Sequence, residues 1–256
     1  GKKIDNLKII EEYLYASFNN GLISIPIETI DMKGDNKNVF SDNKIMLYEY
    51  NELLNKEVPR GFNDIEKIED LFYVTNEESG LSVYKNDFNS LIENFSFNGD
   101  SSNSLASSSP TKLMYVNDKN MLYIGSIGSG LFGLNLKNKT FKNIRSDQGL
   151  LSNNVYDFLN LNGRLYVQSG SGVNYIENNL IKNINIEDGL SNDVFHKESL
   201  HINNNNIYVS GNNTLQRFNY MDLDSKQIKF NISVFNLIGV DEFNKKVIVS
   251  KNQDGI

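Results

Sequence analysis

The two histidines of the chain, His196 and His201, come first because a metal site or a general base often requires histidine. With Glu198 between them, they do not form the zinc-binding helix pattern, in which the two histidines are four residues apart. On a strand, side chains five residues apart point to opposite faces of the sheet, so this pair is poorly placed to share a metal ion. The chain has no cysteine, which excludes thiolate ligands and disulfides. We expect no metal site and no cofactor.

Two further patterns resemble catalytic motifs but lack a required part. Residues 125–130 are rich in glycine and serine, yet they have neither the lysine of a phosphate-binding loop nor the helix that follows such a loop. Glu77-Glu78 and the pair Asp222 and Asp224 lie in no calcium-binding loop pattern. Glycoside hydrolysis needs two carboxylates about 5 to 10 Å apart, which spacing in the sequence does not establish. We interpret the glycines as a turn and the carboxylates as solvated loop residues, and expect the chain not to be an enzyme.

A repeat organises the chain and must position any functional residue. A short apolar strand, a small polar turn that usually contains glycine, and a second apolar strand occur five times. The intervals between aligned positions are 58, 50, 43 and 42 residues, and the last two fit a four-stranded β-propeller blade. The aligned residue is tyrosine in every copy: Tyr15, Tyr73, Tyr123, Tyr166 and Tyr208.

Turn residues divide each unit into strands. Asn162-Gly163 favours a tight hairpin turn between strands 155–161 and 164–168. We therefore predict an all-β chain, a β-propeller of four-stranded blades. Because five repeats are recognisable, we favour a fragment of a larger propeller. The alternative is one more, degenerate unit within residues 38–62, where residues 45–50 offer a strand.

A second repeated element joins consecutive units. Residues 149–155 read Gly-Leu-Leu-Ser-Asn-Asn-Val, and residues 189–194 read Gly-Leu-Ser-Asn-Asp-Val. This linker, together with a strand that ends in a glycine-containing turn, resembles the two-component-regulator propeller repeat of bacterial hybrid histidine kinases. The match is best over residues 113–218. In that family tryptophan is common at the aligned tyrosine position, whereas this chain contains no tryptophan.

The resemblance also bears on the C-terminal part of the chain. Residues 228–234 alternate apolar and polar side chains, which predicts a strand with one buried face. In the family a β-sandwich follows the propeller, so we predict propeller blades over residues 1–227 and the first strands of a β-sandwich over 228–256. The alternative is that residues 228–234 close the propeller by pairing with the N-terminal blade.

The function that the resemblance implies is an extracytoplasmic ligand-sensing domain, on the periplasmic or extracellular side of a bacterial membrane. It implies a small-molecule or oligosaccharide ligand, signalling to a cytoplasmic histidine kinase, and a homodimer in the full-length protein. Membrane contact is expected only through a segment outside this chain. Two alternatives remain, a propeller-fold polysaccharide hydrolase or lyase and a protein-interaction scaffold.

If the blades stack as in other propellers, the loops after each second strand and the linkers between blades open on one face. Polar residues from different blades are then predicted to line a ligand-binding face. They are Asn19, Glu77, Arg145, Asn153, Gln168, Asn192, His196 and Asn212.

Overall charge narrows the class of partner. The formal net charge is -7 and there is no long block of lysine and arginine, so the chain carries no electrostatic footprint for nucleic acid or anionic lipid. The longest apolar stretches fall far below the roughly 18 residues that a membrane-spanning helix requires. We expect no nucleic-acid partner.

Overall fold

The computed structural model contains strands joined by turns and short 3₁₀ helices. It describes residues 4–18, 21–30, 45–49, 62–76, 80–86, 88, 90–95, 109–190, 195–211, 214–224, 230–237 and 249–251, of which 49, 196–198, 224, 230–237 and 249–251 are described by backbone alone. Within these residues no α-helix is present, and no helix is long and apolar enough to cross a membrane.

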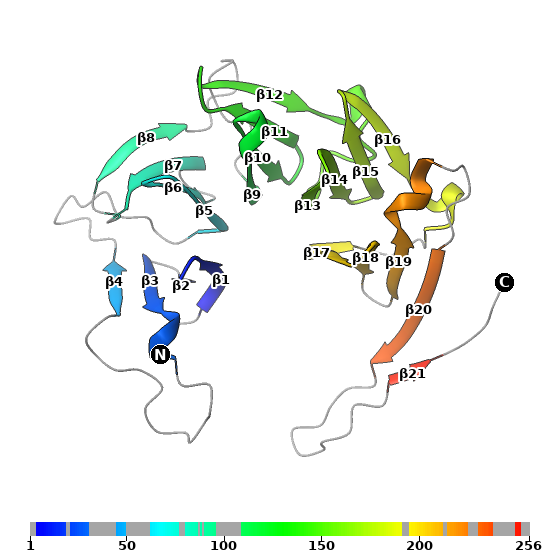
Figure 1. The fold of residues 1–256 in the computed structure, drawn as a ribbon, viewed down its shortest axis with the longest axis horizontal. Helices are drawn as coiled ribbons and strands as arrows, with labels where there is room; N and C mark the ends of the chain where they lie inside the picture. Colours follow the sequence, from blue (N-terminus) through cyan, green and yellow to red (C-terminus); the bar gives the residue numbers. More distant parts are fainter. Residues whose placement is uncertain are drawn as a thin grey trace. The chain divides into compact units, whose positions relative to one another are not determined.

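The strands form antiparallel sheets whose strand order follows the sequence (Figure 1). The first sheet contains β1 (Ile4–Ile10), β2 (Tyr13–Phe18), β3 (Gly21–Pro26) and β4 (Met46–Glu49). The second contains β5 (Asp64–Ile68), β6 (Leu71–Asn76), β7 (Gly80–Lys85) and β8 (Leu91–Phe95). The third contains β9 (Pro110–Val116), β10 (Met121–Ser126), β11 (Gly130–Asn135) and β12 (Thr140–Ile144).

The remaining strands make the fourth and fifth sheets. The fourth contains β13 (Val155–Leu161), β14 (Arg164–Ser169), β15 (Gly172–Glu177) and β16 (Leu180–Ile184). The fifth contains β17 (Phe195–Asn203), β18 (Asn206–Gly211), β19 (Thr214–Asn219), β20 (Phe230–Leu237) and β21 (Val249–Lys251). The first four sheets are four-stranded blades. In the fifth, β17 to β20 form the blade and β21 pairs with β20 as an additional strand. The aligned tyrosines all lie on the second strand of a blade. The predicted β-propeller of four-stranded blades is confirmed.

The predicted hairpin turns are also present. Asn162 and Gly163 have φ angles of 53° and 79°, and Asn178 and Asn179 have φ angles of 50° and 63°. Two consecutive residues with positive φ form the tight turn whose twist matches that of paired strands. Asparagine and glycine tolerate this conformation at low cost, which explains why these residues separate the strands.

Two segments have pairings that bear on the sequence interpretation. β4 pairs with β3, with Leu22 opposite Tyr48, so residues 46–49 are the fourth strand of the first blade rather than part of an additional unit. β20 pairs with β19, with Phe218 opposite Phe230, and thereby continues the fifth sheet. The boundary at residues 227 and 228 and the β-sandwich after it stay predictions.

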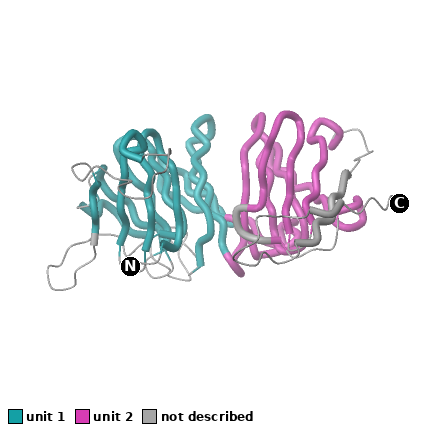
Figure 2. Tube along the Cα trace, turned by 90° about the horizontal axis from the view of Figure 1, so that it is seen from below, with its two compact units in different colours: residues 1–126, 132–143 teal, residues 127–131, 144–256 magenta. Residues whose placement is uncertain are grey.

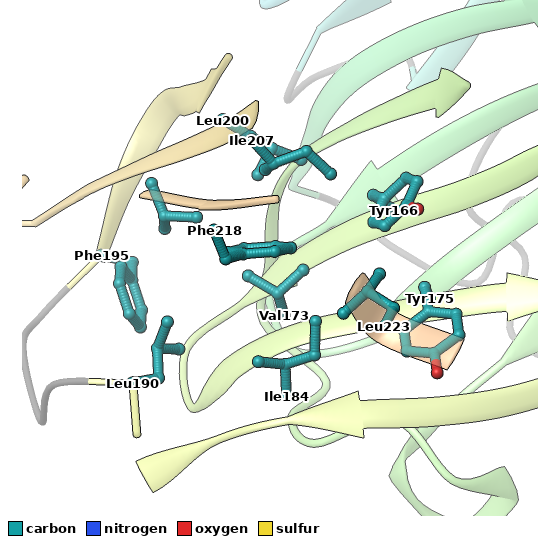
Figure 3. Packing of buried hydrophobic residues seen from close by; sticks show 11 residues of the cluster. Tyr166, Val173, Tyr175, Ile184, Leu190, Phe195, Leu200, Ile207, Phe218 and Leu223 are labelled. Carbon is teal, nitrogen blue, oxygen red and sulfur yellow. The ribbon is translucent and has the colours of Figure 1, made fainter. Parts of the chain in front are cut away.

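The chain divides into two compact units, residues 1–126 with 132–143 and residues 127–131 with 144–256 (Figure 2). In the second unit, the core lies between the fourth and fifth blades. Side chains from β14 and β15, such as Tyr166 and Val173, pack with Leu200 and Ile207 from the next blade (Figure 3). In the first unit, equivalent clusters lie between the first and second blades and between the second and third. The core is therefore built from contacts between neighbouring blades.

Buried aspartates connect the inner strands of neighbouring blades. Asp64 of β5 accepts a hydrogen bond from its own neighbour Ile65 N at 2.8 Å, and its other oxygen accepts from Leu113 N of β9, also at 2.8 Å. Asp157 of β13 does the same with Phe158 N at 2.8 Å and Leu200 N of β17 at 2.9 Å. One carboxylate thus satisfies a backbone donor in its own blade and one in the next blade, where neither can reach water.

The Asp157 bridge is testable by substitution. Asp157→Ala should lower the free energy of unfolding by about 2 to 4 kcal/mol, because two buried N–H groups lose their acceptor. Asp157→Asn should cost less, since its amide oxygen can still accept one of the two bonds. Urea denaturation measures both effects. The control is Asp118→Ala in an exposed turn, which should change stability by no more than about 0.5 kcal/mol. Equal effects of Asp157→Ala and Asp118→Ala would contradict the bridge.

The Tyr15 phenol gives the first unit a pH dependence. Its ring lies 5.4 Å from that of Phe72, and burial, followed by the nearby Tyr48, raises the pKa of Tyr15 to about 12. A raised pKa means that the folded state favours the protonated phenol. The contribution of Tyr15 to the free energy of unfolding is therefore complete below pH about 10 and is lost as the pH rises toward 12. When the pH is raised from 9 to 11, the free energy of unfolding of Tyr15→Phe should fall by about 1 kcal/mol less than that of the parent chain. Urea denaturation at the two pH values measures this difference. Parallel pH profiles for the two proteins would argue against a buried phenol.

Candidate functional site

The linkers between blades have one geometry. A 3₁₀ helix, η4 (Ser146–Gln148), follows β12, and another, η5 (Ile186–Asp188), follows β16. Each ends at a glycine with positive φ, 112° at Gly149 and 104° at Gly189. The next residue, Leu150 or Leu190, is buried at 3% or 2% exposure. The glycine reverses the chain so that the leucine enters the core, which accounts for the Gly-Leu pair of the sequence repeat.

Backbone hydrogen bonds fix each linker in the same way. Leu150 N donates to Arg145 O at 3.2 Å, and Leu190 N donates to Asn185 O at 3.1 Å. Arg145 N in turn donates to Gln148 Oε1 at 3.1 Å, and Asn185 N donates to an oxygen of Asp188 at 3.0 Å. Polar residues of the linker are therefore used to satisfy backbone groups at the ends of the 3₁₀ helices.

Arg145 and Asn153 are the two predicted site residues that the structure brings near each other. Asn153 Oδ1 accepts a hydrogen bond from Ser146 N at 2.8 Å, next to the exposed Arg145. Asn153 O accepts from Gly130 N at 2.8 Å, so the linker is also attached to the start of β11. These bonds give Asn153 a structural role, whereas the Arg145 side chain is exposed.

Gln168, a third predicted site residue, is fully buried at the end of β14. Its Oε1 accepts a hydrogen bond from Ser199 Oγ of β17 at 2.7 Å. Its Nε2 has no hydrogen-bond partner among the described residues. The Gln168 side chain is thus part of the interior between the fourth and fifth blades and does not reach an open surface.

The other predicted residues cannot be placed on a face. Asn19, Glu77, Asn192 and Asn212 lie outside the described residues, and His196 is described only as backbone in β17. The eight-residue ligand-binding face therefore stays a prediction. In the described part of the chain, no group of three or more histidine and acidic side chains could hold a metal ion.

A pocket of about 150 Å³ in the second unit was not predicted from the sequence. It lies where β13 ends and β14 begins, at the opposite end of β13 from the η4 linker, and η6 (Tyr220–Asp224) of the fifth blade forms one side. Its lining residues are Leu161, Asn162, Arg164, Tyr166, Glu177, Tyr220 and Met221.

An ion pair forms the polar part of this pocket. Arg164 Nη2 lies 3.0 Å from Glu177 Oε2, and the side chains are 12% and 41% exposed. The guanidinium also lies over the ring of Tyr175, 5.1 Å from its centroid, which holds the arginine in place. Leu161 and Met221 supply apolar surface, so the pocket combines guanidinium donors, a carboxylate acceptor and apolar walls. This combination suits a small polar ligand with an apolar face.

Part of this pocket could have been found from the sequence. Leu165 pairs with Ile176 in the hairpin, so the register places Arg164 opposite Glu177. The contribution of Tyr220 and Met221 could not be found in this way, because these residues belong to the next blade and reach the pocket only through the packing of the two blades.

No protein-family model and no curated protein matches the chain. Solved structures do match. The extracellular domain of the hybrid two-component system BT4673 from B. thetaiotaomicron has a TM-score of 0.58 at 14% identity, over 89% of this chain and 27% of that chain. For the BT3049 hybrid two-component system of the same organism, the extracellular domain gives 0.64 at 12% identity, over 93% and 33%.

A third match is PorZ, a surface component of the type-IX secretion system of Porphyromonas gingivalis, with a TM-score of 0.56 at 13% identity, over 90% of this chain and 28% of that chain. All three share the β-propeller fold with this chain. The chain spans about a third or less of the length of these proteins.

The turn that precedes β11 allows a test of the linker attachment. Gly128 and Gly130 both have positive φ, 84° and 86°, but a Cβ at Gly128 meets no atom within 4 Å, whereas a Cβ at Gly130 overlaps Ile144 O. Gly128→Ala should therefore cost only the backbone strain, about 1 kcal/mol. Gly130→Ala should cost at least about 2 kcal/mol more, because β12 or the linker must move. Thermal unfolding compares the two variants, and similar losses would show that the close approach is absent.

Proposed function

We propose that this chain is a ligand-sensing propeller from the extracytoplasmic part of a bacterial two-component regulator. The observation that carries the proposal is the match of fold with the extracellular domains of BT4673 and BT3049, over 89% and 93% of this chain. The linker repeat adds support, because its Gly-Leu pair and Ser-Asn segment resemble the propeller repeat of that class of regulator. Binding, rather than catalysis, is the role proposed for the chain.

A small molecule or oligosaccharide is the proposed ligand, and the pocket beside the Arg164 and Glu177 pair is its proposed location. The pocket volume of about 150 Å³ suits one sugar-sized group. Planar polar side chains can hydrogen-bond neighbouring hydroxyls, and Tyr220 offers an aromatic surface at the side of the pocket.

Further parts of the proposal concern the whole protein. The chain would lie on the periplasmic or extracellular side of the membrane and be joined to it through a segment outside the chain. In the full-length protein it would form a homodimer, since a histidine kinase is switched between two arrangements of its subunits. Nucleic acid is not proposed as a partner, given the net charge of -7.

Thermal-shift measurements with an oligosaccharide panel, combined with an assay for released products, test this proposal. A ligand at 100 times its Kd adds about 2.7 kcal/mol to the folded state. We therefore expect a rise in melting temperature of about 5 °C without turnover. Turnover would instead favour a propeller-fold hydrolase or lyase. If no sugar raises the melting temperature, the sensing proposal fails for this ligand class and a protein-interaction scaffold is favoured.

Surface variants locate the bound ligand. Met221 at the pocket is 62% exposed and Leu180, outside it, is 67% exposed, so a glutamate should be tolerated at either position. Met221→Glu should abolish the thermal shift by placing a charge in the pocket, and Leu180→Glu should preserve the shift. Arg145→Ala tests whether the ligand binds at the linker instead of in the pocket. If Arg145→Ala removes the shift and Met221→Glu does not, the ligand binds at the linker and the pocket assignment is wrong.

A further inference from the structure

The inner strand of the first blade differs from its four counterparts in exposure. The aligned Tyr15 of β2 pairs with Lys8 of β1, and the next residue of β2, Ala16, pairs with Leu7. The residues at the same register position of the other four blades are all buried, whereas Leu7 is 58% exposed. The four buried counterparts are Ile65 at 0%, Leu113 at 1%, Phe158 at 1% and Leu200 at 7%.

The preceding blade buries this position wherever both blades lie in one compact unit. Leu113 clusters with Tyr73 of β6 and Leu81 of β7. Leu200 clusters with Tyr166 of β14 and Val173 of β15. Ile65 clusters with Tyr15 and Leu22 in the same manner. In all three cases the position equivalent to Leu7 clusters with the same two groups of the preceding blade. They are the aligned tyrosine of the second strand and an apolar side chain near the start of the third strand.

Backbone hydrogen bonding marks the same position. Leu113 N and Leu200 N each donate to an aspartate of the preceding blade, Asp64 and Asp157, at 2.8 and 2.9 Å. Leu7 has the same register on an inner strand that forms the edge of its sheet, so its N–H lies on the same open edge. In the other two blades, Ile65 N and Phe158 N donate to the aspartate that precedes them on their own strand. The residue that precedes Leu7 is Asn6, so here the carboxylate would come from the preceding blade, as it does for Leu113 and Leu200.

Neighbouring residues extend the uncovered surface. Ile9, two residues further along β1, is 64% exposed. Leu14 of β2 pairs with Ile9 and is half-buried, whereas its four counterparts are 0 to 2% exposed: Phe72, Leu122, Leu165 and Ile207. The surface is apolar on both strands, as expected for a face built to be packed against rather than solvated.

We propose that this surface of β1 and β2 is an inter-blade face that receives a further four-stranded blade, carried by additional propeller sequence of the same polypeptide. The incoming blade contributes a tyrosine from its second strand and an apolar residue from the start of its third. An aspartate from its inner strand accepts a hydrogen bond from Leu7 N. We identify the incoming element as a blade because the same contacts join neighbouring blades elsewhere in the chain.

The proposal can be tested by supplying such a blade. A copy of residues 155–194, the fourth blade with the linker that leads to β17, is placed before Ile4. The chain has no cysteine, so Leu7→Cys introduces a single thiol whose reaction with a maleimide reports exposure. We expect labelling to be at least about tenfold slower with the added blade than without it, because opening of the interface must then precede reaction. Leu180→Cys in the original fourth blade, 67% exposed, should react equally fast in both proteins.

Two further measurements keep the test decisive if the extended protein does not fold. In the chain alone, Leu7→Glu should leave the melting temperature within about 2 °C of the parent, whereas Leu113→Glu at the covered counterpart should lower it by more than about 8 °C. Unchanged labelling of Leu7→Cys in a folded extended protein overturns the proposal, as does a loss for Leu7→Glu equal to that for Leu113→Glu. A stable dimer of the chain that Leu7→Glu dissociates also overturns it, since the occupant is then a second copy.

Discussion

A buried aspartate on the inner strand joins the second blade to the third and the fourth blade to the fifth, and the packing at these junctions depends on it. The inner strand is the edge of its sheet, so its outward N–H groups have no partner within the blade. Asp64 and Asp157 solve this problem by accepting one N–H from their own strand and one from the next inner strand. A polar group that would be costly if buried alone becomes the element that fixes the register between blades.

The linkers and turns follow from the same requirement that blades lie close together. Gly149 and Gly189 turn the chain so that Leu150 and Leu190 reach the core between blades. At the start of β11, Gly130 leaves room for the carbonyl of Ile144 on the neighbouring strand. The glycines of the repeat are thus required by backbone geometry, and their presence says nothing about phosphate binding.

Features that depend on local pattern could be predicted from the sequence. Asn162-Gly163 and the alternating residues around it determine a hairpin whatever surrounds them, and the aligned tyrosines give the blade spacing. Features that depend on packing between blades could not be predicted from the sequence. Gln168 has the pattern of a polar residue at a strand end, but Ser199, 31 residues away, holds it in the interior. The pocket requires Tyr220 and Met221 from the following blade for the same reason.

The polar groups at the two ends of β13 differ in what they leave available for a ligand. At the linker end, Asn153 and Gln148 already accept hydrogen bonds from backbone N–H groups. A ligand there would compete with bonds that hold the linker between the blades in its conformation. At the other end, Arg164 and Glu177 form an ion pair between their side chains, and Glu177 is 41% exposed. Rearranging this pair leaves the backbone intact, so of the two ends of β13 the pocket is the one where binding would disturb the fold less.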